Sequence, residues 1–182
     1  MLCSDSLVKN FLDNVNFHYY IIYPSSFLDE YRDWWRDRNS GGPVKLQWTC
    51  LLTVVCACSA QYLSVEFQRK LEYELGEKTQ TLTERYHQVS RELYGIIPPG
   101  NGHLYSVQYL LHSCYWYKSE ARFTECWYSL SNAIREAQEI GRVKLTQPSD
   151  NSNAFSQVSI KKRPCSVPPT LNAKCTDEFG VY

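Results

Sequence analysis

The sequence is poor in the ligand pairs from which metal sites are built. It holds eight cysteines, but no two of them are separated by two residues, and Cys56 and Cys58 are separated by one. Two thiols at that spacing do not share one face of a helix, whereas zinc sites commonly pair ligands about two to four residues apart. The four histidines form no H-E-x-x-H or comparable pair. We therefore expect neither a metal ion nor another cofactor in this chain.

The motifs of common enzyme classes are also missing. There is no G-x-S-x-G, no G-x-x-x-x-G-K and no G-x-G-x-x-G, and Gly100-Asn101-Gly102 lacks the preceding strand of a phosphate loop. No nucleophile with a base can be nominated, so we predict no catalytic, cofactor-binding or metal-binding residues and a protein that is not an enzyme. We expect the four histidines to lie in solvent or in the core: His18, His87, His103 and His112.

An excess of charge of one sign is absent, because 19 basic residues balance 19 acidic ones. DNA phosphates are bound by clustered Lys and Arg, so this composition argues against DNA binding by the chain itself. The one basic cluster, Lys161–Pro164, is either a nuclear-import patch or a solvated segment. The longest apolar run, Leu51–Cys58, is too short to span a bilayer, and Met1–Ser6 lacks the character of a secretory signal.

The cysteines fit a reducing compartment inside the cell. Cys165 and Cys175 stand in a polar tail and are expected to be free. A further set falls in apolar helical patterns and is expected to consist of buried, reduced thiols, which behave as small hydrophobes. These are Cys50, Cys56, Cys58, Cys114 and Cys126.

Apolar residues are spaced for helices, most clearly between Leu104 and Gly141. The first half of this stretch has an apolar stripe at spacings of three and four, and the polar run Lys118–Glu120 suits a short connection to a second helix. The pair is predicted to form a helical hairpin. The stripe of its first helix is Leu104, Val107, Leu110, Leu111 and Cys114.

The second helix of this hairpin is predicted to bury its large side chains. Ala133 and Ala137 share one face and would let another helix approach closely. Gly141 is expected to end the helix, since glycine tolerates the left-handed conformation common there. The stripe expected to face the core is Phe123, Trp127, Leu130, Ile134, Ala137 and Ile140.

Weaker signals place the remaining elements. Ser4 or Asp5 is expected to cap a first helix, and Phe17–Tyr23 to cross in an extended conformation. Pro24 then ends the crossing, and Ser25 or Ser26 would cap the next helix. Lys45–Tyr62 is apolar around most of its circumference and is predicted to be the central buried helix. Further expectations are a loop at Asn39–Pro43, a solvated connection or short helix at Glu66–Lys78, a helix starting at Thr81 or Thr83, and a turn at Ile96–Gly102.

The order of residues in two blocks resembles the fungal-specific transcription factor domain. This is the middle homology, or regulatory, region found downstream of binuclear zinc clusters, including those of xylanolytic-activator-type regulators. The resemblance covers roughly residues 7–141. One block is Val107-Gln108, Leu110-Leu111, Tyr115, Trp127, Ala133-Ile134-Arg135, Ala137-Gln138 and Gly141. The other is Asn10-Phe11-Leu12, Asn16, Ile21–Phe27, Tyr31 and Trp34-Trp35.

Two segments follow from these patterns. Residues 1–145 are predicted to be an all-α regulatory domain of packed helices and helical hairpins. Residues 146–182 are polar and proline-rich without a sustained period, and are predicted to be a disordered tail. After Gly141 the sequence departs from the family, which continues with more helices, so we expect the domain to be incomplete at its C-terminal side.

The resemblance implies a non-catalytic regulator of transcription located in the nucleus. Zinc would belong to a separate cluster, and DNA would be bound only through an N-terminal module missing here. The implied partners are transcriptional co-regulators or a small effector. The alternative is a free-standing helical interaction scaffold, or a truncated remnant without function. Aromatic side chains that could line an effector pocket, or else pack in the core, are Tyr19, Tyr20, Tyr115, Trp116, Tyr117 and Tyr128. At least one residue of each adjacent pair, Tyr19-Tyr20 and Trp116-Tyr117, is expected to point away from the core.

Overall fold

The computed structural model describes residues 2–98 and 103–146, with side chains for residues 4–98 and 103–141. The helices below all lie within the unit Met1–Gln147. The predicted tail, with Cys165, Cys175 and the basic cluster, lies outside the described residues except for Thr146.

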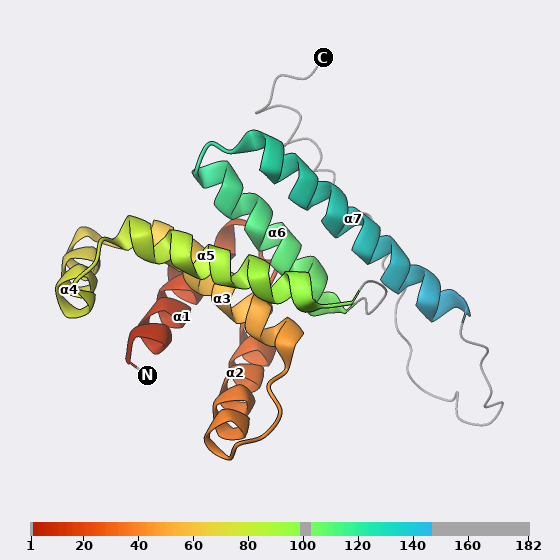
Figure 1. Cartoon of the computed structure of the whole chain (residues 1–182), viewed down its shortest axis with the longest axis horizontal. Helices are drawn as coiled ribbons and strands as arrows, with labels where there is room; N and C mark the ends of the chain where they lie inside the picture. Colours follow the sequence, from red (N-terminus) through yellow and green to blue (C-terminus); the bar gives the residue numbers. More distant parts are fainter. Residues whose placement is uncertain (1, 99–102, 147–182) are drawn as a thin grey trace. The chain divides into compact units, whose positions relative to one another are not determined.

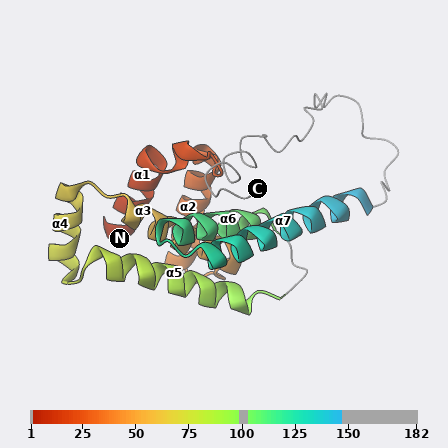
Figure 2. The same cartoon turned by 90° about the horizontal axis from the view of Figure 1, so that it is seen from above.

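The described part of the chain is all-α, as predicted, and contains no strand (Figures 1 and 2). The α-helix α3 lies between α1, α5 and α6, and α7 packs antiparallel along α6. Seven α-helices and one 3-10 helix follow in order: α1 (Leu2–Asn14), η1 (Asn16–His18), α2 (Pro24–Asn39), α3 (Leu46–Gln61), α4 (Val65–Leu75), α5 (Thr79–Ile96), α6 (Leu104–Ser119) and α7 (Phe123–Thr146).

The prediction that α3 is the central helix is confirmed, because nearly every residue from Trp48 to Ala60 is buried. One of its polar side chains bonds to the backbone of a neighbouring helix: Ser59 Oγ donates to the carbonyl of Leu7 on α1 at 2.7 Å. In return, Thr83 Oγ1 of α5 donates to the carbonyl of Ala57 at 2.7 Å. Buried hydroxyls of this kind stay hydrogen-bonded, which fixes how the helices are aligned.

Helix α2 is held to α3 by aromatic side chains around Trp48. Phe27 stacks on Trp48 with ring centroids 5.7 Å apart, and Trp34 Nε1 donates to Thr49 Oγ1 at 2.9 Å. The expected serine cap of α2 is wrong, because Tyr23 is the N-cap and makes no side-chain cap bond. Pro24 occupies the first turn, where its missing N–H costs nothing.

The N-terminal segment differs from its prediction at two places. Helix α1 begins at Leu2, so Ser4 and Asp5 lie inside it rather than at its cap. The segment after α1 is not an extended crossing: Asn16–His18 forms a 3-10 turn, and Tyr20 adopts a positive φ of 51°. Its polar contacts require this fold, as described below.

For Glu66–Lys78, the short-helix alternative is the correct one. Ser64 caps α4 by accepting from Phe67 N at 3.3 Å, and Gly76 ends it in the left-handed conformation with φ 68°. Helix α5 begins at Thr79, earlier than predicted. Thr79 is held there because its N–H and hydroxyl both donate to Glu72 Oε1 at 2.9 Å.

The predicted α6–α7 hairpin is confirmed. Of the α7 stripe expected to face the core, Leu130 packs against it, but the expectation is wrong for Phe123, Trp127, Ile134 and Ala137, which are exposed. The small side chains of Cys126, Ser129 and Ala133 face α6 instead. Small residues allow the two backbones to approach closely, as expected for Ala133, but large ones on this face would not fit. The prediction that Gly141 ends the helix is also wrong, since α7 continues to Thr146.

Candidate functional site

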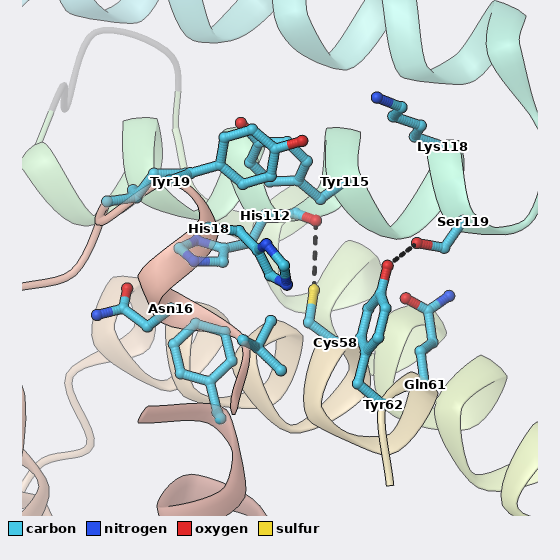
Figure 3. Close-up of a pocket in the computed structure, with 13 residues that line it drawn as sticks. Asn16, His18, Tyr19, Cys58, Gln61, Tyr62, His112, Tyr115, Lys118 and Ser119 are labelled. Atoms are coloured by element: carbon cyan, nitrogen blue, oxygen red, sulfur yellow. Dashed lines mark hydrogen bonds between the residues drawn. The ribbon is translucent and has the colours of Figure 1, made fainter. Parts of the chain in front are cut away.

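A pocket of about 340 Å³ lies where α1, the α1–α2 linker, the end of α3 and α6 meet (Figure 3). Aromatic and apolar side chains form most of its walls, and a few polar groups point into it. Its lining consists of Phe11, Val15, Asn16, His18, Tyr19, Ile21, Cys58, Gln61, Tyr62, His112, Tyr115, Lys118 and Ser119.

The linker folds over the pocket as a strap, residues 15–22. Asn16 is buried and closes this strap, because its amide donates to the carbonyl of Ile22 at 2.8 Å and its Oδ1 accepts from Ile22 N at 3.2 Å. Gln108 of α6 donates to the carbonyl of Ile21 at 3.1 Å and ties the strap to the helix. The left-handed turn at Tyr20 follows from this closure, and it directs Tyr19 toward α6.

Two tyrosines form one wall of the pocket. The ring of Tyr19 in the strap stacks on that of Tyr115 in α6, with centroids 3.8 Å apart and planes 20° apart (Figure 3). At this separation the two rings overlap face to face, so each buries much of one face of the other. This wall therefore depends on the position of the strap.

His112 lies at the back of the pocket and is only 4% exposed. Its Nδ1 is 2.6 Å from the carbonyl oxygen of Gln108, which can only accept, so Nδ1 carries the proton. Burial lowers the pKa of His112 to about 4, although the bond to Gln108 opposes that shift. The ring is thus neutral near pH 7, and its Nε2 presents a lone pair to which no described residue donates.

Cys58 stands beside His112 but does not form a catalytic pair with it. The Cys58 thiol donates to the backbone carbonyl of His112 at 3.4 Å and not to its ring (Figure 3). Burial raises the pKa of the Cys58 thiol far above its ordinary value. A thiol held in its protonated form is a poor nucleophile, so this pair indicates binding rather than bond-making.

The far rim is polar. The hydroxyls of Tyr62 and Ser119 are 2.8 Å apart and link the end of α3 to the end of α6 (Figure 3). Gln61 donates to Glu120 Oε1 at 2.7 Å, while its own Oε1 is buried without a hydrogen-bond partner among the described residues. An unpaired buried acceptor costs about 1–3 kcal/mol, which marks this rim as incompletely satisfied.

The aromatic residues singled out from the sequence divide between pocket, core and surface. Tyr19 and Tyr115 line the pocket, whereas Tyr20 and Tyr128 point to solvent. The expectation that one residue of each adjacent pair leaves the core holds for Tyr19-Tyr20. It is wrong for Trp116-Tyr117, since both are buried.

Neighbours on two sides explain why both Trp116 and Tyr117 are buried. The His87 ring of α5 stacks on Trp116 at 3.8 Å, and the Arg122 guanidinium covers Tyr117 at 5.0 Å from the ring centroid. Helix α6 therefore has two buried faces, which a one-sided apolar stripe does not anticipate.

The sequence did not point to the other lining residues. His112, Cys58 and Gln61 come from helices far apart in the chain and share no spacing pattern. Of the histidines, His87 and His112 are buried, while His18 and His103 are exposed. The five cysteines expected to be buried and reduced are so.

A second pocket of about 410 Å³ lies between α2, α3 and α6, with Trp48 on its floor. Three carboxylates line it, and each pairs with a basic residue on α2 or before α3. Asp29 meets Arg32 at 2.8 Å, Glu30 meets Lys45 at 3.5 Å, and Asp33 meets Arg36. Since these charges are already compensated and exposed, the acidic side of this pocket gives little reason to expect a ligand.

Within the described residues, no group of His, Cys, Asp and Glu is arranged to hold a metal ion. No single described helix has the length and apolar character needed to cross a membrane. Among the described helices, α3 and α4 have this length and apolar character only when they are counted together, and a bend of 120° separates them.

The described residues form an all-α architecture with a pocket between its helices, and comparison with known proteins specifies the family. The family described as "Fungal specific transcription factor domain" matches residues 8–164, which is most of the chain and extends past Gly141. The chain therefore belongs to this family. A relative, "Probable transcription factor sol4" of Alternaria solani, is 26% identical over 139 residues, covering 75% of this chain and 25% of the relative. The chain thus spans about a quarter of that protein's length. The comparison with solved structures found no match for this chain. Both matches support a role in transcription regulation.

Proposed function

We propose that this chain is the regulatory, non-catalytic region of a fungal zinc-cluster transcription factor, which acts in the nucleus. DNA binding would be supplied by a zinc cluster outside this sequence. The observation that carries the proposal is the family match over residues 8–164, joined to a pocket whose thiol and imidazole are both neutral. Such a pocket suits recognition of a small effector.

The mechanism is a change in helix packing controlled from the pocket. An effector that fills the space beneath the strap would hold Tyr19 against Tyr115 and favour one position of the strap on α6. A ligand shifts such an equilibrium only by its differential affinity for the two states. The favoured packing would expose or mask an activation or DNA-binding segment supplied elsewhere, or a surface for co-regulators.

A reporter assay tests this function. The 182-residue chain is fused to an unrelated DNA-binding domain and expressed in a fungal host with a reporter behind the matching sites. We expect the fusion to change reporter output relative to the DNA-binding domain alone. Tyr19→Ala should alter that change, and Tyr20→Ala, which leaves the pocket wall intact, should not. A fusion that matches the DNA-binding domain alone would contradict the regulatory function.

The second candidate is a helical interaction scaffold, and the surface of α7 favours it. Large apolar side chains stand exposed there, with Phe123 47%, Ile134 52% and Tyr128 69% exposed. Exposed apolar patches mark interaction sites in many proteins. A scaffold and a remnant without function both predict a silent reporter, so the same assay separates them from a regulator.

A further inference from the structure

We propose that the pocket beneath the strap binds an uncharged, planar compound of about two fused aromatic rings, with a phenol-type hydroxyl that donates to Nε2 of His112. The inference deepens the proposed function, on which it rests for the regulatory meaning of the bound compound. The binding itself can be measured without any transcription readout.

The size of the pocket limits the occupant. A cavity of about 150 Å³ is enough to bind one benzene ring. The pocket holds about 340 Å³, a little more than twice that volume. It lies at the low end of the ~300–1,000 Å³ typical of small-molecule sites. Two fused rings therefore fit, whereas a large cofactor does not.

The shape of the walls favours a flat aromatic compound. The Phe11 ring lies 5.4 Å from the His112 ring on one side, and the Tyr19–Tyr115 stack forms the other wall. Because the Phe11 and His112 planes are 56° apart, a flat aromatic molecule would make edge contacts as well as stacking contacts with this lining. Because Tyr19 belongs to the strap, the occupant also contacts the element that covers it.

The polarity of the back wall calls for a hydrogen-bond donor. Nδ1 of His112 is already used by the carbonyl of Gln108, which leaves Nε2 as an acceptor in a ring that is 4% exposed. The neighbouring thiol of Cys58 donates to a backbone carbonyl and not to this nitrogen. A hydroxyl on the ligand donates a hydrogen bond to Nε2. An ether oxygen has no hydrogen to donate and would place its lone pair against that of Nε2.

The charges of the lining favour an uncharged compound. Among the described residues no carboxylate lines the pocket, so a cation finds no counter-ion there. Lys118 supplies an ammonium group to the described lining, and Figure 3 shows it above Ser119 and apart from His112. An anionic group placed at the back wall would therefore meet the lone pair of His112 instead of a positive charge.

Three probes of one size class test the donor requirement on the full chain. They are 2-naphthol, 2-methoxynaphthalene and naphthalene, titrated at about pH 7, well below the pKa of about 10 of a phenol. We expect 2-naphthol to bind about tenfold more tightly than 2-methoxynaphthalene, the equivalent of about 1.4 kcal/mol. Equal affinities, a preference for the ether, or no binding of any probe would overturn the inference.

Matched variants locate the binding. Tyr19→Ala removes one wall and should weaken 2-naphthol binding about tenfold, whereas its exposed neighbour Tyr20→Ala should leave it unchanged. His112→Phe keeps a ring in place and should abolish the preference for the hydroxyl. Should that variant fail to fold, the Tyr19 and Tyr20 pair still decides, and equal affinities for the two would overturn the assignment. If the fusion changes reporter output but the chain shows no preference for 2-naphthol in the titration, this inference is contradicted and the regulatory function is not.

Discussion

The Sγ atom of Cys114 on α6 lies 3.2 Å from the Sγ atom of Cys126 on α7, and both side chains are buried. The contact marks the seam of the hairpin. Directly along this seam, Ser129 Oγ donates to the carbonyl of Leu110 at 2.7 Å. The two helices therefore meet through small side chains, which brings the two thiols into hydrogen-bond contact without a covalent bond between them.

Oxidation should join Cys114 to Cys126. The sulfur atoms are 3.2 Å apart, and a disulfide bond of about 2.05 Å needs only a small approach. Diamide would accept the two electrons and two protons that the thiols lose. We expect peptide mapping to show the linked pair, and the free energy of unfolding to rise by about 2–3 kcal/mol. Cys126→Ser is the control that cannot form the link. The contact would be contradicted if both thiols of the folded protein stayed reduced under conditions in which diamide oxidises the unfolded protein completely.

Two alanines one turn apart on α7 should differ in how well they tolerate a larger side chain. Ala133 is 2% exposed against α6, so Ala133→Leu should overfill the seam and lower the free energy of unfolding by about 1–3 kcal/mol. Ala137 is exposed, and Ala137→Leu should stay within about 0.5 kcal/mol of the parent. Urea unfolding measures both. A larger loss at Ala137 would mean that α7 presents its other face to α6.

Stability should fall as the pH is lowered, because two histidines are buried in the neutral form. Burial, assisted by the charges of Arg91 and Arg122, lowers the pKa of His87 from 6.5 to about 3, and burial lowers that of His112 to about 4. The unfolded chain binds protons on both near pH 6.5, while the folded chain does not. Their contribution is therefore complete above that pH and is lost as the pH falls toward the folded values.

Each of the two buried histidines should lower the free energy of unfolding by about 2 kcal/mol as the pH falls from about 7 to 5. Urea unfolding at each pH measures this loss. His87→Gln should remove about half of the pH dependence. The control is Gln88→Ala, a change in an exposed neighbouring side chain that does not titrate, which should leave the slope as it is. A flat profile over this range would contradict the neutral burial of both rings.

Helix positions were predictable because apolar spacing reports them directly. The continuous apolar circumference of Lys45–Tyr62 identified α3, and the polar run Lys118–Glu120 identified the hairpin break. Helix ends were less predictable. From the sequence, Ser25 was a good candidate for the N-cap of α2. In the structure, however, α2 begins at Pro24 and has no side-chain cap. End positions depend on which nearby group satisfies the terminal N–H groups, and residues outside the helix decide that.

The orientation of α7 shows where hydrophobicity misleads. The stripe of Phe123 and Ile134 is more apolar than the stripe of Ser129 and Ala133, and yet the smaller stripe faces α6. Close packing of two helices depends on the volume of the side chains as well as on their polarity. The side-chain volume that fits at the contact is set by the partner helix, and the spacing of residues within α7 carries no information about that helix.

The sequence by itself determined the all-α class, the central helix, the helical hairpin and the family, because each depends on local periodicity or on residue order. Only the tertiary structure decided that Asn16 closes a strap over α6, that His112 is a buried neutral acceptor, and that Cys114 meets Cys126. Each of these joins residues from separate turns or helices. The chemistry of a pocket depends on what lies across it, and a linear pattern records only what lies next along the chain.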